Sequence, residues 1–245
     1  MCMLFVSKKM KRNIFVCTKI FLHISDDVPD EIIHQISSYL DLPTLTTTIS
    51  LVNKRWNYIV ENNNKLWETF SFSYPINLDE RALQKIYKHC NFFTTFLGGN
   101  AEITINAPLQ DLYFNNIFSC AKNIVYLELD NTEVSSLFAL KYLKSLEILS
   151  LNHCINIQNC DIEVLEQLQN IEQLYIMHTS ISARAICDVF KEGRSKLFVL
   201  DLQGTEFIYS EILTVLRILP NLNFFGLSLF ETISLANFDS TFRPK

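Results

Sequence analysis

The hydrophobic positions of this 245-residue chain follow two different periods. Over residues 26–67 they recur at helical spacing, and Val52, Trp56, Ile59 and Val60 follow the i, i+4, i+7, i+8 pattern of one helix face. Beyond this region the spacing becomes that of short strands that recur at regular intervals along the chain. The pattern therefore predicts a helical N-terminal module followed by a larger repetitive region.

The run VPDEIIHQISSYLDLP opens the helical module and predicts its first two helices. One of the aspartates at 26–27 can cap a helix whose first turn holds Pro29 and which continues to about Leu40. Pro43 then opens a second helix that reaches about Ser50. The first helix is apolar on more than one face, which a lone surface helix would not be.

Five later segments share the pattern apolar-x-x-apolar-x-apolar. They are IVYLEL (124–129), LEILSL (146–151), IEQLYI (171–176), LFVLDL (197–202) and LNFFGL (222–227). Their spacings of 22, 25, 26 and 25 residues fall in the leucine-rich-repeat range. The pattern predicts strands that line the concave side of a curved solenoid, with helices on the outside. An ordinary α/β domain with parallel strands is the alternative.

The position three residues after each predicted strand motif is also regular, and a small polar or thiol side chain there can bond the backbone. These positions hold Thr132, Cys154, Thr179, Thr205 and, last, Phe230. Helical segments are predicted at SARAICDVFKEG and YSEILTVLRILP. We expect an earlier strand at AEITIN (101–106) and an entry repeat formed by WETFSFS (67–73) and the helix LDERALQKIYKHC.

The charge is unevenly distributed along the chain. The net charge is −5, which disfavours a nucleic-acid binder because such a protein needs a basic face. Residues 1–25 nevertheless contain five basic residues and no acidic one, so the remainder, with 16 basic and 26 acidic residues, carries about −10. We interpret the start as a solvated extension, because Lys19 interrupts its apolar part and no cleavage site of a signal peptide follows. No run approaches the roughly 18 apolar residues of a membrane span.

The seven cysteines indicate neither a disulfide framework nor a zinc site. Their number is odd, no pair has the C-x-x-C spacing, and the five histidines do not cluster with them. Scattered free thiols favour a reducing compartment, the cytoplasm or the nucleus. We expect no metal and no cofactor.

The helical module resembles an F-box. The runs VPDEIIHQISSYLDLP, LVNKRW and KLWETF are similar to the Leu-Pro-x-Glu start, the Tyr-Leu helix end and the Val-Cys-Lys-x-Trp and Leu-Trp close of that family. The match covers about 45 residues and departs from the pattern at Val28, usually Leu, and Asn53, usually Cys. The whole layout is similar to F-box/leucine-rich-repeat proteins, among them the S-phase-kinase-associated type.

The resemblance implies a substrate-recognition subunit of an SCF-type ubiquitin ligase, in which a Skp-type adaptor bridges the F-box to a cullin–RING ligase. It implies that Trp56 ties the helices together and that Leu66 and Trp67 join the module to the repeats. The implied adaptor contacts are Pro29, Ile32, Ile33, Ile36, Leu40, Leu42, Leu45 and Val52. These side chains could instead be internal core of one continuous domain.

Candidate catalytic groups are few, and none converges with others. Cys154 follows His153, but it occupies a repeat position that threonine holds elsewhere, which explains it structurally. Glu128 and Asp130 share a strand face, and we interpret them as solvated acids. The sequence predicts no catalytic residue, so the chain is expected to be a non-enzymatic subunit.

The strand alternation predicts which residues face the concave side. They are Tyr126, Glu128, Asp130, Ile148, Ser150, Asn152, Gln173, Tyr175, Met177, Val199, Asp201, Gln203, Phe224, Gly226 and Ser228. None is Lys or Arg, whereas recognition of a phosphorylated peptide usually needs arginine. We therefore expect a neutral or basic protein segment as substrate. Its predicted contacts are Tyr126, Glu128, Tyr175, Met177, Asp201 and Phe224. Docking on loops or the tail, or charge supplied by an accessory protein, is the alternative.

The predicted organisation has four parts. Residues 1–25 form the basic extension, 26–67 the F-box, 68–230 the leucine-rich repeats and 231–245 a cap or tail. A non-degradative leucine-rich-repeat scaffold is the competing function, and neither a nucleic acid nor a membrane is an expected partner.

Overall fold

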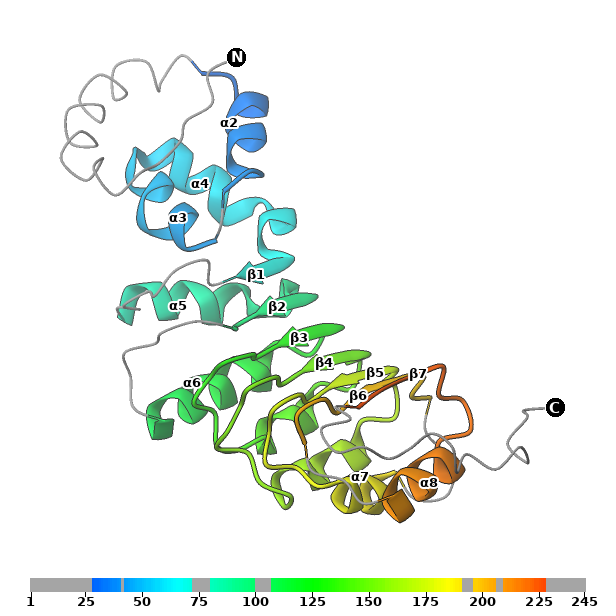
Figure 1. Ribbon diagram of the computed structural model, residues 1–245. Helices are drawn as coiled ribbons and strands as arrows, with labels where there is room; N and C mark the ends of the chain where they lie inside the picture. Colours follow the sequence, from blue (N-terminus) through cyan, green and yellow to red (C-terminus); the bar gives the residue numbers. More distant parts are fainter. Residues whose placement is uncertain are drawn as a thin grey trace.

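The computed structural model describes residues 28–40, 42–71, 80–99, 107–190, 196–205 and 209–227. Figure 1 shows a helical module at one end of the molecule and a column of strands that runs away from it, with helices along one side of the column. The fold is therefore α/β, with a helical N-terminal part and a solenoid of parallel strands.

The N-terminal module contains three α-helices linked by 3-10 turns. Its elements are α2 Asp30–Ser37, α3 Leu42–Thr47, the 3-10 helix Ile49–Leu51, α4 Lys54–Asn62 and the 3-10 helix Asn64–Trp67. Helix α3 packs against the first strand and against α5 Glu80–His89, so the module lies directly on the solenoid.

Helix α2 is shorter than the pattern predicts. Pro29 is the N-cap residue rather than part of the first turn, and its carbonyl accepts from the amides of Ile32 and Ile33 at 3.1 and 3.2 Å. At the other end the amides of Tyr39 and Leu40 turn to carbonyls three residues back, which ends the α-helix. The residues at 26–27, expected as caps, lie outside the described residues.

Helix α4 begins at a side-chain cap that the family pattern does not supply. The Oδ1 atom of Asn53, the residue that replaces the usual Cys, accepts a hydrogen bond from the Trp56 amide at 2.9 Å. Asparagine is among the best N-cap residues, and such a cap typically contributes about 1 kcal/mol. This departure from the family pattern therefore stabilises the helix that carries Trp56.

Seven parallel strands form one sheet in sequential order. They are β1 Thr69–Ser71, β2 Thr95–Leu97, β3 Tyr126–Glu128, β4 Ile148–Ser150, β5 Gln173–Tyr175, β6 Val199–Asp201 and β7 Phe224–Gly226. The register aligns the central residues Phe70, Phe96, Leu127, Leu149, Leu174, Leu200 and Phe225 in one row. The five predicted strand motifs and the entry strand are thus confirmed in position and register.

The crossovers between strands carry the outer helices. They are α5, the 3-10 helix Cys90–Phe92, α6 Ala107–Cys120, the 3-10 helices Phe138–Tyr142 and Asp161–Gln167, α7 Ala183–Val189 and α8 Tyr209–Ile218. The helices predicted for the entry repeat and before and after β6 are confirmed as α5, α7 and α8. Two of the crossovers use 3-10 turns instead of α-helix.

The strand next to β3 is not the predicted one. The segment AEITIN lies outside the described residues, and β2 at Thr95–Leu97 fills the place beside β3. The motif of β2 is concealed because Gly98 stands where other repeats have a third apolar residue. A Cβ atom at Gly98 would lie 2.7 Å from Phe96 Cε1 and 3.0 Å from Leu129 Cδ2, so neighbouring side chains already fill that space.

The core changes in composition along the solenoid. At its start the rings of Phe70 and Phe96 stack at 4.7 Å, and Phe118 meets Phe96 edge-on at 5.4 Å. From β3 to β6 leucine and isoleucine fill the equivalent positions and are fully buried. In β7 the corresponding Phe225 is only half-buried. The aromatic end therefore lies next to the helical module.

The chain leaves each strand through a repeated turn. Asn131, His153, His178 and Gly204, each three residues after a strand, have φ values of 56°, 59°, 52° and 75°. The next residue satisfies a carbonyl: Thr132, Thr179 and Thr205 donate to the carbonyl three residues back at 2.7, 2.9 and 2.6 Å. The predicted backbone role of this position is thus confirmed for the threonines.

Candidate functional site

Helix α2 divides its apolar residues between two faces. Ile33, Ser37 and Leu40, at i, i+4 and i+7, turn inward, and Ile33 packs against Trp56 and Ile59. The neighbouring stripe of Ile32, Ile36 and Tyr39 is 44%, 37% and 80% exposed. We call this stripe the α2 outer face. The helix is therefore apolar on two sides, and the described residues of the chain cover only one of them.

The eight predicted adaptor contacts separate by burial. Pro29, Ile32 and Ile36 are exposed, and Leu40 and Val52 are half-buried. Ile33, Leu42 and Leu45 are buried, so their side chains pack inside this chain. The structure thus brings the first three to one surface and assigns the last three to packing. The eight contacts themselves stay a prediction.

Three large apolar side chains extend the exposed surface of the module beyond the predicted set. Tyr39 continues the α2 outer face, while Leu51 and Tyr58 lie on the 3-10 turn and on α4. The heptad-like spacing of Ile32, Ile36 and Tyr39 could have identified Tyr39 in the sequence. Leu51 has no such signal, because it lies in a turn whose orientation no period fixes.

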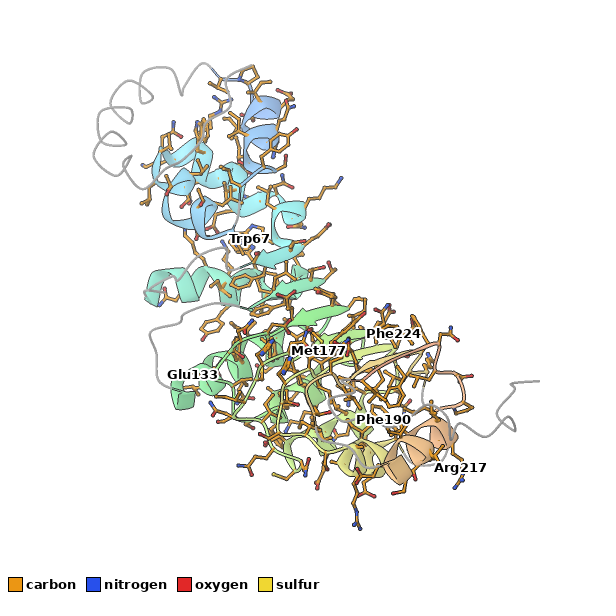
Figure 2. All side chains as sticks on the ribbon, viewed as in Figure 1. Trp67, Glu133, Met177, Phe190, Arg217 and Phe224 are labelled. Atoms are coloured by element: carbon orange, nitrogen blue, oxygen red, sulfur yellow. The ribbon has the colours of Figure 1, made fainter. Side chains whose placement is uncertain are left out.

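Trp67 joins the module to the repeats, as the sequence predicts. The indole is fully buried, its Nε1 donates to the Val60 carbonyl at 3.0 Å, and its ring stacks on His89 at 3.8 Å and 15°. Figure 2 shows Trp67 at the level where the helical module meets the first strands. The contact links the end of α4 to the end of α5.

A charged cluster surrounds this stack. Glu61 on α4 pairs with Lys88, with Lys85 at 3.7 Å and with His89 Nε2 at 3.3 Å. Burial alone would raise the pKa of Glu61, but hydrogen bonds from Lys88 and His89 outweigh it and lower the pKa. Burial lowers the pKa of His89 despite the opposing hydrogen bond with Glu61. His89 Nε2 and the Glu61 carboxylate thus form a hydrogen bond at the joint between α4 and α5.

The concave face has the alternation that the sequence predicts. Leu127, Leu149 and Leu174 point into the core, and the residues on either side of each point outward. Of the six predicted substrate contacts, Phe224 is 48% exposed and Asp201 is buried, while Tyr126, Glu128, Tyr175 and Met177 are half-buried. Figure 2 shows Met177 and Phe224 over the later strands. Ser228 lies outside the described residues.

Neutral groups hold the three concave carboxylates. Asp130 accepts from Ser150 Oγ at 2.7 Å and from the amide and Nδ2 of Asn152 at 2.9 and 3.0 Å. Glu128 accepts from the Tyr126 hydroxyl at 3.1 Å, and Asp201 accepts from the amide of Gln203 at 3.2 Å. Within the described residues no lysine or arginine forms an ion pair with these three acids. These acids therefore accept hydrogen bonds from neutral groups, and no cation of the described residues neutralises their charge.

The pKa of Tyr126 reflects the negative charge of the neighbouring acids. Burial, together with the hydrogen bond to Glu128, raises the pKa of its phenol to about 12. Asp130 adds repulsion against a phenolate. The hydroxyl thus stays protonated and serves as a donor, not as a base.

The His153–Cys154 pair has no catalytic geometry. The Cys154 thiol is fully buried, its Sγ lies 3.0 Å from the Leu129 carbonyl, and burial raises its pKa. His153 is exposed and its ring stacks on His178 at 4.6 Å and 15°, so the two rings lie in nearly parallel planes. Lone pairs in parallel planes do not converge on one ion. Among the described residues no three His, Cys, Asp or Glu side chains group to hold a metal.

No helix in the described part of the chain is long and apolar enough to cross a membrane.

Residues 25–73 match the family model described as F-box-like, a segment that covers the whole helical module and β1. Together with the seven in-register parallel strands, this match shows an F-box-like segment followed by a solenoid of leucine-rich-repeat type. Both parts are of the kind that proteins use for interaction with other proteins. Among curated protein sequences, none matches the chain significantly.

Solved structures with some similarity include bacterial leucine-rich-repeat proteins. Internalin C2 of Listeria monocytogenes has 16% identity and a TM-score of 0.42, over 69% of this chain and 84% of that one. A leucine-rich-repeat protein of Leptospira interrogans has 17% identity and a TM-score of 0.44, over 69% of this chain and 44% of that one. The fold assignment rests on the strand register of the chain itself rather than on these similarities.

Proposed function

We propose that this chain is the substrate-recognition subunit of an SCF-type ubiquitin ligase, and that the F-box binds a Skp-type adaptor while the repeats hold a target protein. The observation that carries the proposal is the exposed α2 outer face within an F-box-like module. F-box domains generally bind such adaptors. A cytoplasmic or nuclear location fits the role.

The mechanism is proximity without bond chemistry in this chain. The cullin–RING part of the assembly would bring a ubiquitin-loaded enzyme to lysines of the bound target, at a high effective concentration. Trp67 and the Glu61 cluster support this role because they fix the adaptor-binding end against the repeats.

Adaptor binding is tested by pull-down of the adaptor and cullin with wild-type chain and with the triple variant Pro29→Ala/Ile32→Ala/Ile36→Ala. We expect the variant to lose most of the captured adaptor because it removes the exposed apolar anchors. Phe138→Ala/Ile155→Ala is the matched control, since both side chains are exposed but lie on the repeats. Equal capture by all three proteins would refute the adaptor role.

Target half-life separates this function from a non-degradative scaffold. Proximity labelling with and without proteasome inhibition identifies proteins that accumulate at the repeats. A target whose half-life is longer with the triple variant than with the wild type supports the ligase role. If the wild type captures the adaptor but target half-lives are the same with both proteins, a scaffold is supported.

The concave face is the proposed target site, with Tyr126, Tyr175, Met177 and Phe224 as anchors for a neutral or basic segment. The preference is supported by the ion pairs of the described residues, none of which joins a lysine or arginine to Glu128, Asp130 or Asp201. A peptide array compares basic, neutral and phosphorylated sequences. A strict requirement for phosphate would refute the preference.

A further inference from the structure

The concave sheet face combines exposed apolar groups with negative charge. Tyr126, Ile148, Val199 and Phe224 are the first residues of β3, β4, β6 and β7, and the strand register aligns them in one row across the sheet. Each is at least partly accessible. The carboxylates of Glu128, Asp130 and Asp201 accept hydrogen bonds from neutral donors, and such bonds leave the negative electrostatic potential of the face in place. A ligand that fits it carries both cationic and apolar side chains.

One segment of the chain itself has this composition. Residues 1–25 contain no acidic residue, and their apolar residues are interspersed with cations. The cations are Lys8, Lys9, Lys11, Arg12 and Lys19. The rest of the chain carries about −10, and the described concave positions include no lysine or arginine. The charge of the segment is thus complementary to that of the face.

The chain before α2 is long enough to reach the face. Twenty residues separate Lys8 from Val28 and span up to about 70 Å when extended. Six strand steps from β1 to β7 cover only about 29 Å, and α2 adds about 12 Å. Figure 1 shows α2 at the far end of the module, with the strands following on in one column. Lys8 to Arg12 can therefore reach β3 and β4.

We propose that residues 1–25 dock in cis on the concave face as a pseudosubstrate, so that a basic, apolar target must displace them. The inference deepens the proposed function because it takes this face as the target site. Tethering gives the segment an effective concentration of order millimolar, enough for a weak contact to occupy the face. Binding of a target would then be controlled by competition with the chain's own segment.

Carbodiimide cross-linking of the dilute full-length chain tests the contact directly, because it joins lysine amines to carboxylates without a spacer. We expect cross-links from Lys8, Lys9, Lys11 or Lys19 to Glu128 or Asp130. Glu128→Gln removes those at residue 128, and 0.5 M NaCl reduces all of them severalfold by screening. The matched control is Glu163→Gln/Glu166→Gln, which neutralises exposed acids of the outer 3-10 helix and leaves the cross-links unchanged.

Three outcomes would overturn the proposal. The lysines could cross-link to Glu163 and Glu166 as often as to Glu128, or not to the concave face at all. In an equal mixture of isotopically heavy and light chains, cross-links within a chain never join a heavy to a light copy, so mixed cross-links at the share expected from random pairing would assign the segment to a second molecule. None of these measurements contains the adaptor, so they stand apart from a failure of the ligase role.

A competition experiment gives the second readout. A fluorescent synthetic peptide of residues 1–25 is titrated into the full-length wild type and into the variant Lys8→Gln/Lys9→Gln/Lys11→Gln/Arg12→Gln/Lys19→Gln. We expect the variant to bind the peptide about tenfold more tightly, because its own segment no longer competes. Equal affinity for both chains would contradict occupation in cis.

Discussion

The helical module at residues 28–67 and the repeats beyond it differ in what they leave at the surface. In the module the α2 outer face is an apolar stripe that nothing in the described chain covers. In the repeats the concave polar groups are satisfied by one another, from Asp130 through Ser150 to Asn152. The α2 outer face thus exposes apolar side chains, whereas the concave face has paired polar groups and a negative charge that no described cation neutralises.

The difference follows from size and from repetition. About 40 residues in three short helices cannot enclose all their apolar side chains, so part of the set stays exposed. In the repeats, equivalent positions lie side by side on neighbouring strands, so a polar side chain on one strand is close to a possible hydrogen-bond partner on the next. The exposed surface of the module is therefore mainly apolar, whereas that of the concave face is partly polar and acidic.

Removal of the joint between the two regions should have the largest effect. Trp67→Ala deletes a fully buried indole that spans both, and we expect it to lower the free energy of unfolding by about 3–5 kcal/mol. Urea unfolding by circular dichroism should change from one transition to two, as the module melts first. Tyr58→Ala, an exposed aromatic on α4, is the control and should leave the midpoint unchanged. A single, barely shifted transition for Trp67→Ala would show that the two regions are not coupled there.

Equal truncations in the two regions should differ in cost. Leu149→Ala leaves a cavity in a fully buried row, at about 2–5 kcal/mol, whereas Ile36→Ala on the α2 outer face should stay within about 0.5 kcal/mol. Thermal or urea unfolding of both variants measures the contrast. A comparable loss for Ile36→Ala would mean that the stripe is core rather than interface.

Acid should weaken the joint in two windows, with a smaller effect. The folded pKa of His89 is lowered, so stability falls as the pH drops below its ordinary value of 6.5, where the unfolded chain takes up the proton more readily. Glu61 also has a lowered pKa, and its contribution is lost as the pH falls below its ordinary 4.5.

His89→Phe isolates the first of these windows. The variant keeps a ring against Trp67 and removes the titrating group, so the free energy of unfolding should become flat between pH 7 and 5.5. Urea unfolding at each pH measures it. A wild type that is already flat over this range would contradict the shift.

The smallest effect is expected for Cys154→Thr in the repeats. Threonine fills the equivalent position at Thr132, Thr179 and Thr205 and bonds the backbone there. We expect a change within about 1 kcal/mol in chemical unfolding. Thr205→Val is the comparison: it removes the hydroxyl from a buried carbonyl contact and should cost about 1 kcal/mol or more.

The sequence predicts the repeats well because burial of the inner row demands the same residue types at each step. Leu127, Leu149, Leu174 and Leu200 therefore align in the letters as they do in the sheet. Strand β2 was missed where Gly98 replaces an apolar residue that two neighbours make unnecessary. Such compensation depends on side chains distant in the sequence, and no local period shows it.

For the candidate surfaces, the sequence predicts which residues share a face but not which of them are buried or paired. Alternation located the concave residues, but the bonds that bury Asp201 and occupy Asp130 need the folded register. In α2 the helical period could separate Ile32 from Ile33, yet which of the two faces stays uncovered depends on where Trp56 lies.

The single-file order of the strands gives the molecule a mechanical direction. Each strand pairs only with its neighbours, and β7, with its half-buried Phe225, pairs with a single strand among the described residues. A pulling force applied at β7 would therefore detach the strands one after another, starting with β7. The opposite end is locked by stacked aromatic rings and by the helices of the module. A load would therefore be released from the repeats long before it reached the α2 outer face.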